Sequence, residues 1–147
     1  MPGHNSRWRA SIDYDASTLK VREMRILAVD DDTGTLNALR AYLATAGYEV
    51  VAAPGGCQAL EMIEASIRET EPIDLMITDL KMPRMNGLEL IQKARTERLW
   101  LPALLMTAYG DASVRRKVKQ LRSCGYLEKP FDPEELLAKI DDALRWR

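Results

Sequence analysis

Histidine and cysteine are scarce in this 147-residue sequence. The one histidine, His4, lies near the N-terminus, so the body of the chain has no imidazole for a catalytic triad or for a phosphohistidine donor. The two cysteines, Cys57 and Cys124, are far apart and lack Cys-x-x-Cys spacing, which favours two packed thiols over a disulfide framework or a zinc site. We therefore expect the chemistry of this chain to come from carboxylates, hydroxyls and amines.

Long apolar runs and a charge excess are also missing. No run approaches the roughly 18 apolar residues that a membrane span needs, and no apolar segment follows Arg7 and Arg9 as it would in a secretory signal. Lys and Arg number 21 against 22 Asp and Glu, which gives no general attraction to nucleic acid or to an anionic membrane. We expect one cytoplasmic domain that contacts neither membrane nor, directly, nucleic acid.

Residues 1–24 show no sustained hydrophobic period, whereas a regular pattern begins at Arg25. We therefore divide the chain into an N-terminal tail or leader, residues 1–24, and a domain, residues 25–147. A short helix over residues 16–23 that docks on the domain and a mobile segment remain equally open alternatives for the tail.

Short continuous apolar runs within the domain predict strands that are buried on both faces of a parallel sheet. Three such runs are Ile26–Val29, Leu75–Ile77 and Ala103–Met106. Two further strands are predicted at Tyr48–Ala53 and Gly125–Glu128.

Apolar residues at helical spacing lie between and after these strands. They are Leu36, Leu39 and Leu43, then Leu60, Ile63 and Ile67, then Leu88 and Ile91, then a helix over about residues 112–122, and finally Leu136, Leu137, Ile140 and Leu144. Asp132 is the expected N-cap of the last helix, and Pro133 fits its first position. Five strands that alternate with five helices predict an α/β fold with a doubly wound parallel sheet, whose ligand crevice lies beyond the carboxyl ends of the strands.

Chemically useful side chains follow four of the predicted strands: Asp30-Asp31-Asp32, Asp79, Thr107 and Lys129. Clustered carboxylates repel one another unless a cation joins them, and hard oxygen ligands favour Mg²⁺. Lysine and threonine at the same edge suit the oxygens of a phosphoryl group. Singly, these residues are better explained as a helix cap, a turn residue, a strand-end hydroxyl and a surface charge, and for Asp32 the cap is the expected role. Together, they predict phosphoryl transfer to a carboxylate.

Four motifs in this order resemble the receiver domains of bacterial two-component response regulators. They are Ile26–Asp32, Asp79–Leu90, Thr107–Tyr109 and Gly125–Phe131. The resemblance covers about residues 25–147 and implies a flavodoxin-like, three-layer fold with strand order 2-1-3-4-5.

The same resemblance implies a metal site for Mg²⁺ or Mn²⁺. On this reading Asp79 is the phosphoacceptor and a metal ligand, Asp31 is a direct ligand, Asp30 acts mostly through water, and the backbone carbonyl of Lys81 completes the set. Asn86 and Gly87 fit the tight loop that keeps this carbonyl turned toward the ion.

Thr107 and Lys129 are the residues that the resemblance assigns to the phosphoryl oxygens. The donor is then the phosphohistidine of a histidine kinase or of a phosphotransfer protein, and the domain promotes its own phosphorylation and dephosphorylation without being a conventional enzyme. For the signal, Thr107 moves toward the phosphoryl group and Tyr126 turns inward, which reshapes the face formed by the fourth helix, the fifth strand and the fifth helix.

The output partner is expected to be a protein or, on phosphorylation, a second copy of the chain. The fourth helix carries a basic run that fits an acidic partner and a solvated helix face equally well: Arg115, Arg116, Lys117, Lys119 and Arg122. No helix-turn-helix follows before Arg147, so output by protein contact is expected unless the chain is a fragment.

Two other functions fit parts of the sequence. Asp31-Asp32-Thr33-Gly34-Thr35 resembles the phosphorylation loop of P-type ATPases and haloacid-dehalogenase phosphatases, but that assignment leaves Asp79 and Lys129 unexplained. A pseudo-receiver with the fold and no phosphorylation is the second alternative, and the intact acidic residues and lysine argue against it.

Overall fold

The computed structural model describes residues 10–14, 19–97, 101–108 and 110–145. Its centre is a parallel sheet of five strands in the order β4-β3-β5-β6-β7. The strands are β3 (Arg25–Val29), β4 (Glu49–Ala53), β5 (Leu75–Asp79), β6 (Ala103–Thr107) and β7 (Cys124–Glu128). Because two further strands precede β3 in the chain, this is the predicted 2-1-3-4-5 order within the domain, and the prediction is confirmed.

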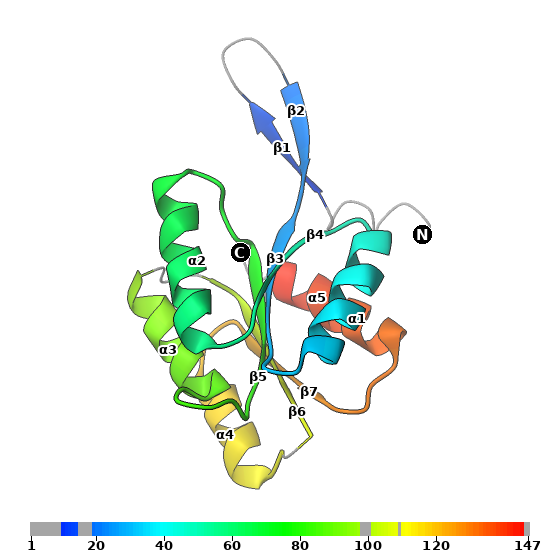
Figure 1. The fold of residues 1–147 in the computed structure, drawn as a ribbon. Coiled ribbons are helices and arrows are strands. Elements are labelled where there is room, and N and C mark those ends of the chain that lie inside the picture. The colour runs from blue at the N-terminus through cyan, green and yellow to red at the C-terminus, as the bar shows by residue number, and fades with distance from the viewer. Residues whose placement is uncertain (1–9, 15–18, 98–100, 109, 146–147) are drawn as a thin grey trace.

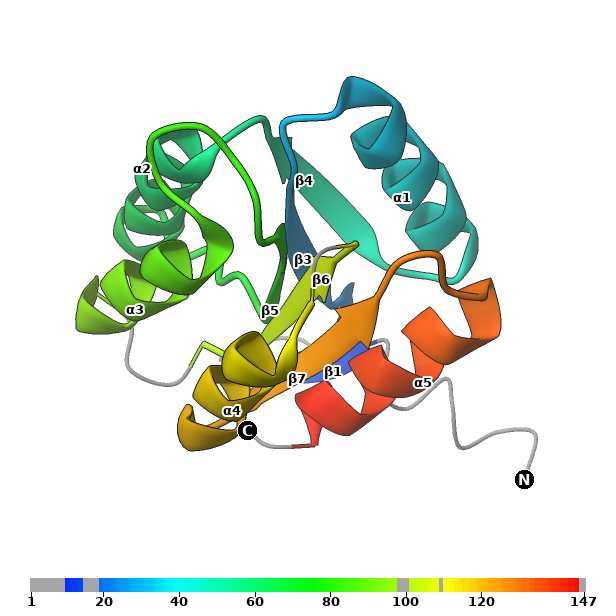
Figure 2. The ribbon, with the colours of Figure 1, turned by 90° about the horizontal axis from the view of Figure 1, so that it is seen from below.

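Five helices cover the two faces of the sheet. They are α1 (Thr33–Thr45), α2 (Gly56–Arg68), α3 (Gly87–Glu97), α4 (Ala112–Gln120) and α5 (Pro133–Leu144). Figure 2 shows α1 and α5 on one side, and α2, α3 and α4 on the other. The doubly wound, three-layer α/β fold predicted from the alternating pattern is therefore present.

The core is split by the sheet into two apolar clusters. In β3, Ile26 and Ala28 pack with residues of α1 and α5, whereas Leu27 and Val29 pack with residues of α2 and α3. This division follows from the alternation of side chains along a strand. Every residue of the central strand β5 and of β6 is buried, as expected for strands covered on both faces.

A β-hairpin precedes the domain. Strand β1 (Ala10–Tyr14) pairs antiparallel with β2 (Leu19–Glu23) in a separate two-stranded sheet, which lies beyond the start of β3 in Figure 1. The alternative of a short helix over residues 16–23 is therefore wrong for residues 19–23. Residues 19–22 alternate apolar and charged side chains, a period of two that favours a strand, and this stretch is too short to stand out in the sequence.

The expected burial of two side chains of α2, one near its end and one near its beginning, differs from the structure. Ile67 was expected on the buried helix face but is 47% exposed, because Ser66 takes the inward position of the last turn and donates its hydroxyl to the carbonyl of Ile63 at 2.7 Å. Cys57 is exposed rather than packed. Cys124 is partly buried, and burial raises the pKa of its thiol to about 11. Both cysteines are free thiols, as predicted.

The ends of the other helices agree closely with the sequence. Asp132 and Pro133 occupy the N-cap and the first turn of α5, although the Asp132 side chain makes no capping hydrogen bond. Helix α4 ends at Gln120, slightly before the predicted limit near residue 122.

The peptide bond between Lys129 and Pro130 is cis. Among the described residues, no helix combines the length and the apolar character needed to cross a bilayer.

Two isoleucines of α2 allow a matched test of the core. Replacement of the fully buried Ile63 by alanine leaves a cavity and should lower the free energy of unfolding by about 3 kcal/mol. Replacement of the exposed Ile67, one turn later, should lower it by less than about 1 kcal/mol. Urea unfolding followed by circular dichroism measures both, and equal losses would contradict the assignment of these faces.

Candidate functional site

Three consecutive aspartates follow β3 and have three different environments. Asp30 is 1% exposed and its backbone N–H donates to Ala53 at 3.2 Å, which extends the pairing of β3 with β4. Asp31 is exposed. Asp32 is the N-cap of α1, where its carboxylate accepts from the backbone N–H of Thr35 at 3.0 Å and from the Thr35 hydroxyl at 2.6 Å. The hydrogen bonds from Thr35 lower the pKa of Asp32, and its predicted role as a helix cap is confirmed.

Asp79 is the last residue of β5 and is 8% exposed. The loop after it is closed tightly: the backbone N–H of Leu80 donates to Met106 at 2.9 Å, and that of Gly87 donates to the Leu80 carbonyl at 2.8 Å. Asn86 and Glu89 exchange side-chain to backbone hydrogen bonds of 2.9 Å each, which cap α3. The loop is therefore held at both ends next to the acidic side chain.

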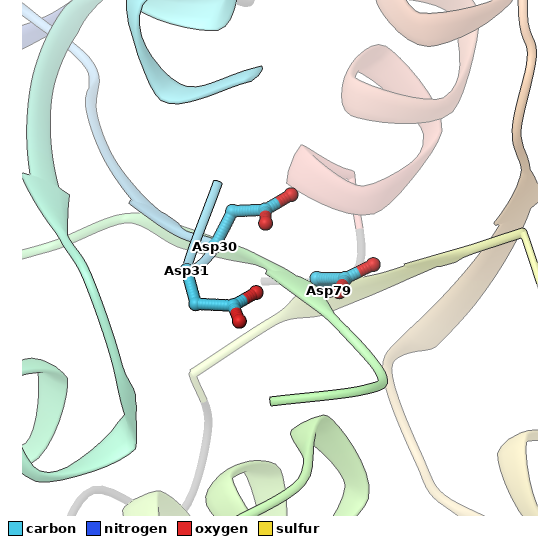
Figure 3. Close-up of side chains that lie close together, drawn as sticks. All are labelled: Asp30, Asp31 and Asp79. Atoms are coloured by element: carbon cyan, nitrogen blue, oxygen red, sulfur yellow. The ribbon is translucent and has the colours of Figure 1, made fainter. Parts of the chain in front are cut away.

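The carboxylates of Asp30, Asp31 and Asp79 come together at the carboxyl edge of the sheet. One oxygen of each lies within 4.8 Å of the others, and Figure 3 shows the three side chains close together where the adjacent strands β3 and β5 end. This proximity is the result expected from parallel strands that end at the same edge.

Lys129 supplies the positive charge of this cluster. Its Nζ lies 3.1 Å from Asp30 Oδ2 and 3.1 Å from Asp79 Oδ1, and its backbone N–H donates to the Thr107 carbonyl at 2.9 Å. The residue follows directly after β7, so its side chain spans from the fifth strand of the sheet to the ends of β3 and β5. The sequence-predicted lysine is therefore in direct contact with two of the predicted acids.

Burial and neighbouring charges have opposing effects on the pKa values of Asp79 and Lys129. Burial raises the pKa of Asp79 above its ordinary value, and the neighbouring Asp30 and Asp31 raise it further, against the lowering effect of Lys129. Burial also disfavours the charged form of Lys129, but its hydrogen bonds with Asp79 and Asp30 outweigh this, so that its pKa is raised. An additional cation would stabilise the ionised form of Asp79.

The donor set fits a small divalent cation. All three side chains offer carboxylate oxygens, the hard ligands that Mg²⁺ and Mn²⁺ prefer, and no histidine or cysteine belongs to the cluster. Lys81 lies in the loop two residues beyond Asp79 with its side chain exposed, and the part assigned to its backbone carbonyl stays a prediction. Thr107 is fully buried at the end of β6, between the strands that carry Asp79 and Lys129.

Glycines around this site have a role that the sequence did not reveal. A Cβ atom on Gly87 would lie 2.3 Å from the carbonyl oxygen of Asp79, and one on Gly56 would lie 2.6 Å from the sulfur of Met85. Gly87 was read from the sequence only as a turn residue, which marks where a chain bends and not what it approaches. The side-chain-free position keeps the loop in contact with the acceptor strand.

Tyr126 is packed inward against a third glycine. Its hydroxyl oxygen would lie 1.4 Å from a Cβ atom placed on Gly110, and this oxygen is buried with no hydrogen-bond partner among the described residues. The sequence assigned an inward position of Tyr126 to the signalling state. The structure has the hydroxyl inside already, beside the chain that follows Thr107.

A family model and two similar relatives assign the chain to the same protein family. Residues 26–141 match the family described as the response regulator receiver domain. The chain is 41% identical over 122 residues to the response regulator MprA of Mycobacterium leprae (strain TN), covering 83% of this chain and 51% of that protein. It is 34% identical over 131 residues to the transcriptional regulatory protein GlrR of Escherichia coli (strain K12), covering 83% of this chain and 28% of that protein.

Solved structures show the same fold. The chemotaxis protein CheY4 of Vibrio cholerae aligns with a TM-score of 0.74 at 30% identity, covering 82% of this chain and 98% of that chain. A CheY-like receiver domain protein of Methanospirillum hungatei JF-1 aligns with a TM-score of 0.73 at 34% identity, covering 83% and 94%. The chain thus spans about half the length of MprA, and nearly all of these solved domains.

Two glycine-to-alanine changes should affect the free energy of unfolding differently. Gly87→Ala places a methyl group against the Asp79 carbonyl and should lower the free energy of unfolding by about 1–3 kcal/mol. Gly34→Ala, in the first turn of α1, meets its nearest atom at an ordinary 3.6 Å and should leave stability unchanged or raise it by up to about 1 kcal/mol. Urea unfolding of both variants decides this, and a stable Gly87→Ala protein would show that the close approach is unimportant.

Proposed function

The chain belongs to the response regulator receiver domain family of two-component signalling, and from this premise we propose that it accepts a phosphoryl group on Asp79. The observation that carries the proposal is the position of this carboxylate, buried at a strand end, beside two other acids and 3.1 Å from the Lys129 ammonium. The Lys129 ammonium can neutralise negative charge on a phosphoryl group while the Asp79 carboxylate attacks its phosphorus atom.

The proposed reaction transfers the phosphoryl group from the phosphohistidine of a histidine kinase or of a phosphotransfer protein. A carboxylate oxygen of Asp79 attacks phosphorus, the bond from phosphorus to the imidazole nitrogen breaks, and an acyl phosphate forms on Asp79. The proton that the imidazole gains comes from solvent or from the donor protein. Hydrolysis of the acyl phosphate resets the domain, so we class it as a self-modifying signalling domain and not as a conventional enzyme.

Each polar residue of the site has a defined part in this proposal. Lys129 leaves its contact with the ionised Asp79 and pairs with a phosphoryl oxygen, and the Thr107 hydroxyl donates to another. Asp30, Asp31, Asp79 and the Lys81 carbonyl would hold Mg²⁺ or Mn²⁺. When bound, that ion supplies positive charge against the phosphoryl oxygens.

The partners follow from this chemistry. We propose a histidine kinase or phosphotransfer protein upstream and a protein target downstream, or a phosphorylation-dependent homodimer, engaged through the face of α4, β7 and α5. The near-neutral charge of the chain supports protein contact over direct nucleic-acid contact by this domain, and cytoplasmic location remains our expectation. The relative GlrR is a transcriptional regulatory protein, and this chain covers 28% of it. The proposal on partners therefore concerns this domain and not the output of a longer protein.

The phosphatase alternative has no support at the residues on which it rests. Asp32 and Thr35 of the loop that resembles it are hydrogen-bonded to each other as the cap of α1. The buried acids that contact Lys129 are Asp30 and Asp79, and neither belongs to that loop.

The direct test is incubation of the protein and of Asp79→Asn with acetyl phosphate and Mg²⁺, with and without chelator, followed by intact-mass measurement. We expect only the wild-type protein to gain one phosphoryl group, and only with the metal, because the variant lacks the nucleophilic oxygen. An equal gain by the variant would place the acceptor elsewhere, with Asp31 the first candidate. No gain by either protein would favour a pseudo-receiver.

Lys129 provides a test of the metal site that needs no phosphorylation. Lys129→Met removes an ammonium that contacts two of the three acids, so Mg²⁺ should bind about five- to tenfold more tightly in calorimetric titrations. Lys93→Met makes the same chemical change on the exposed part of α3 and should leave the affinity unchanged. Unchanged or weaker binding by Lys129→Met would show that lysine and cation do not share these carboxylates.

A further inference from the structure

A groove lies between the loop that follows Asp79 and helix α4. It has a volume of about 470 Å³, within the range of pockets that hold ligands or side chains of a partner. Met82, Pro83 and Leu88 line it on the side of the loop and α3, and Val114 lines it on α4. Figure 2 shows α3 and α4 following one another on the same side of the sheet, so the groove opens between neighbouring elements.

Two lysines flank these apolar walls. Lys81 lines the groove from the loop and Lys117 from α4, and both side chains are exposed. Within the described part of the chain, no carboxylate lies within ion-pair distance of Lys117. Glu89, an acid in the first turn of α3, is already engaged in the cap with Asn86. The groove therefore combines an apolar floor with a net positive rim.

The basic residues of α4 lie on more than one side of the helix. Arg115 points toward β7, where it lies 3.7 Å from Glu128, and it belongs to the face already assigned to output. Val114 and Lys117 are three positions apart and share the groove side instead. No acid occurs anywhere in residues 112–127, so this positive charge is not balanced locally along the chain.

We propose that this groove is a second docking surface, and that it binds an acidic segment of a partner protein which inserts one apolar side chain between Leu88 and Val114. A carboxylate beside the inserted residue pairs with Lys117, and the segment passes Lys81 on the other side of the groove. Charge complementarity selects an acidic segment, and the apolar walls select a residue such as leucine over a polar one. The surface is separate from the face of α4, β7 and α5, and its occupation does not depend on phosphorylation.

The test uses the full 147-residue protein and a fluorescein-labelled nonapeptide, Gly-Ser-Glu-Glu-Leu-Glu-Glu-Ser-Gly. We expect saturable binding in fluorescence anisotropy that weakens as salt is added, because the rim contacts are exposed to solvent. A peptide with serine in place of leucine should bind at least about fivefold more weakly, since it loses the burial of one apolar side chain. Equal affinity of the two peptides, or no saturable binding up to about 1 mM, overturns the proposal.

A matched pair of charge reversals locates the site. Lys117→Glu should weaken binding of the leucine peptide about tenfold, because it places a carboxylate at the rim of the groove. Lys119→Glu makes the same change on the same helix but outside the groove lining and should change affinity less than about twofold. Equal losses in both variants would show general attraction to a basic helix and would overturn the docking site.

Amide chemical shifts of the isotope-labelled protein give an independent reading. On titration with the leucine peptide, shifts should concentrate in residues 80–88 and 114–118. Shifts confined to β7 and α5 would assign the peptide to the output face and contradict the proposal. Because this measurement uses the unphosphorylated protein, its result stands apart from any failure to phosphorylate Asp79.

Discussion

The Lys129 ammonium contacts Asp30 and Asp79 at 3.1 Å each, and through these two ion pairs it joins the ends of β3, β5 and β7. The acids follow two neighbouring interior strands of the sheet, β3 and β5, and the lysine follows the edge strand β7. Such a contact requires parallel strands that finish level with one another, which in turn requires the buried apolar runs that set their register. Three carboxylates in one small space are mutually repulsive, so the lysine stabilises an arrangement that a divalent cation or a phosphoryl group can then alter.

Close packing connects this site to the elements around it. Gly87 touches the carbonyl of Asp79, and Gly56 receives the side chain of Met85, so the acceptor strand, its loop and the start of α2 have little freedom to move separately. On the other side, Gly110 receives the Tyr126 hydroxyl beside the end of β6. Tightly packed elements change between discrete arrangements and do not deform gradually. A new charge on Asp79 therefore has direct routes to helices on one layer of the fold.

Helix α4 stands between two surfaces of different character. Toward β7 its arginine faces an acidic residue, and toward α3 its lysine borders an apolar groove next to the acceptor loop. A helix that buries only Val118 has few contacts to hold it, and positions of this kind are the ones that shift in signalling proteins. The two surfaces therefore differ in the chemistry that they present to a partner.

Much of this protein was determined by local features of its sequence. Apolar runs and helical spacing predicted all five strands and all five helices of the domain, and strand-end residues predicted the acids and the lysine, because periodicity and side-chain chemistry are readable without neighbours. Only the tertiary structure decided that Ile67 is exposed, that a hairpin precedes Met24, and that Gly87 lies against a carbonyl. Each of these depends on which atoms approach one another once the chain has folded. A residue's own type and spacing do not carry that information.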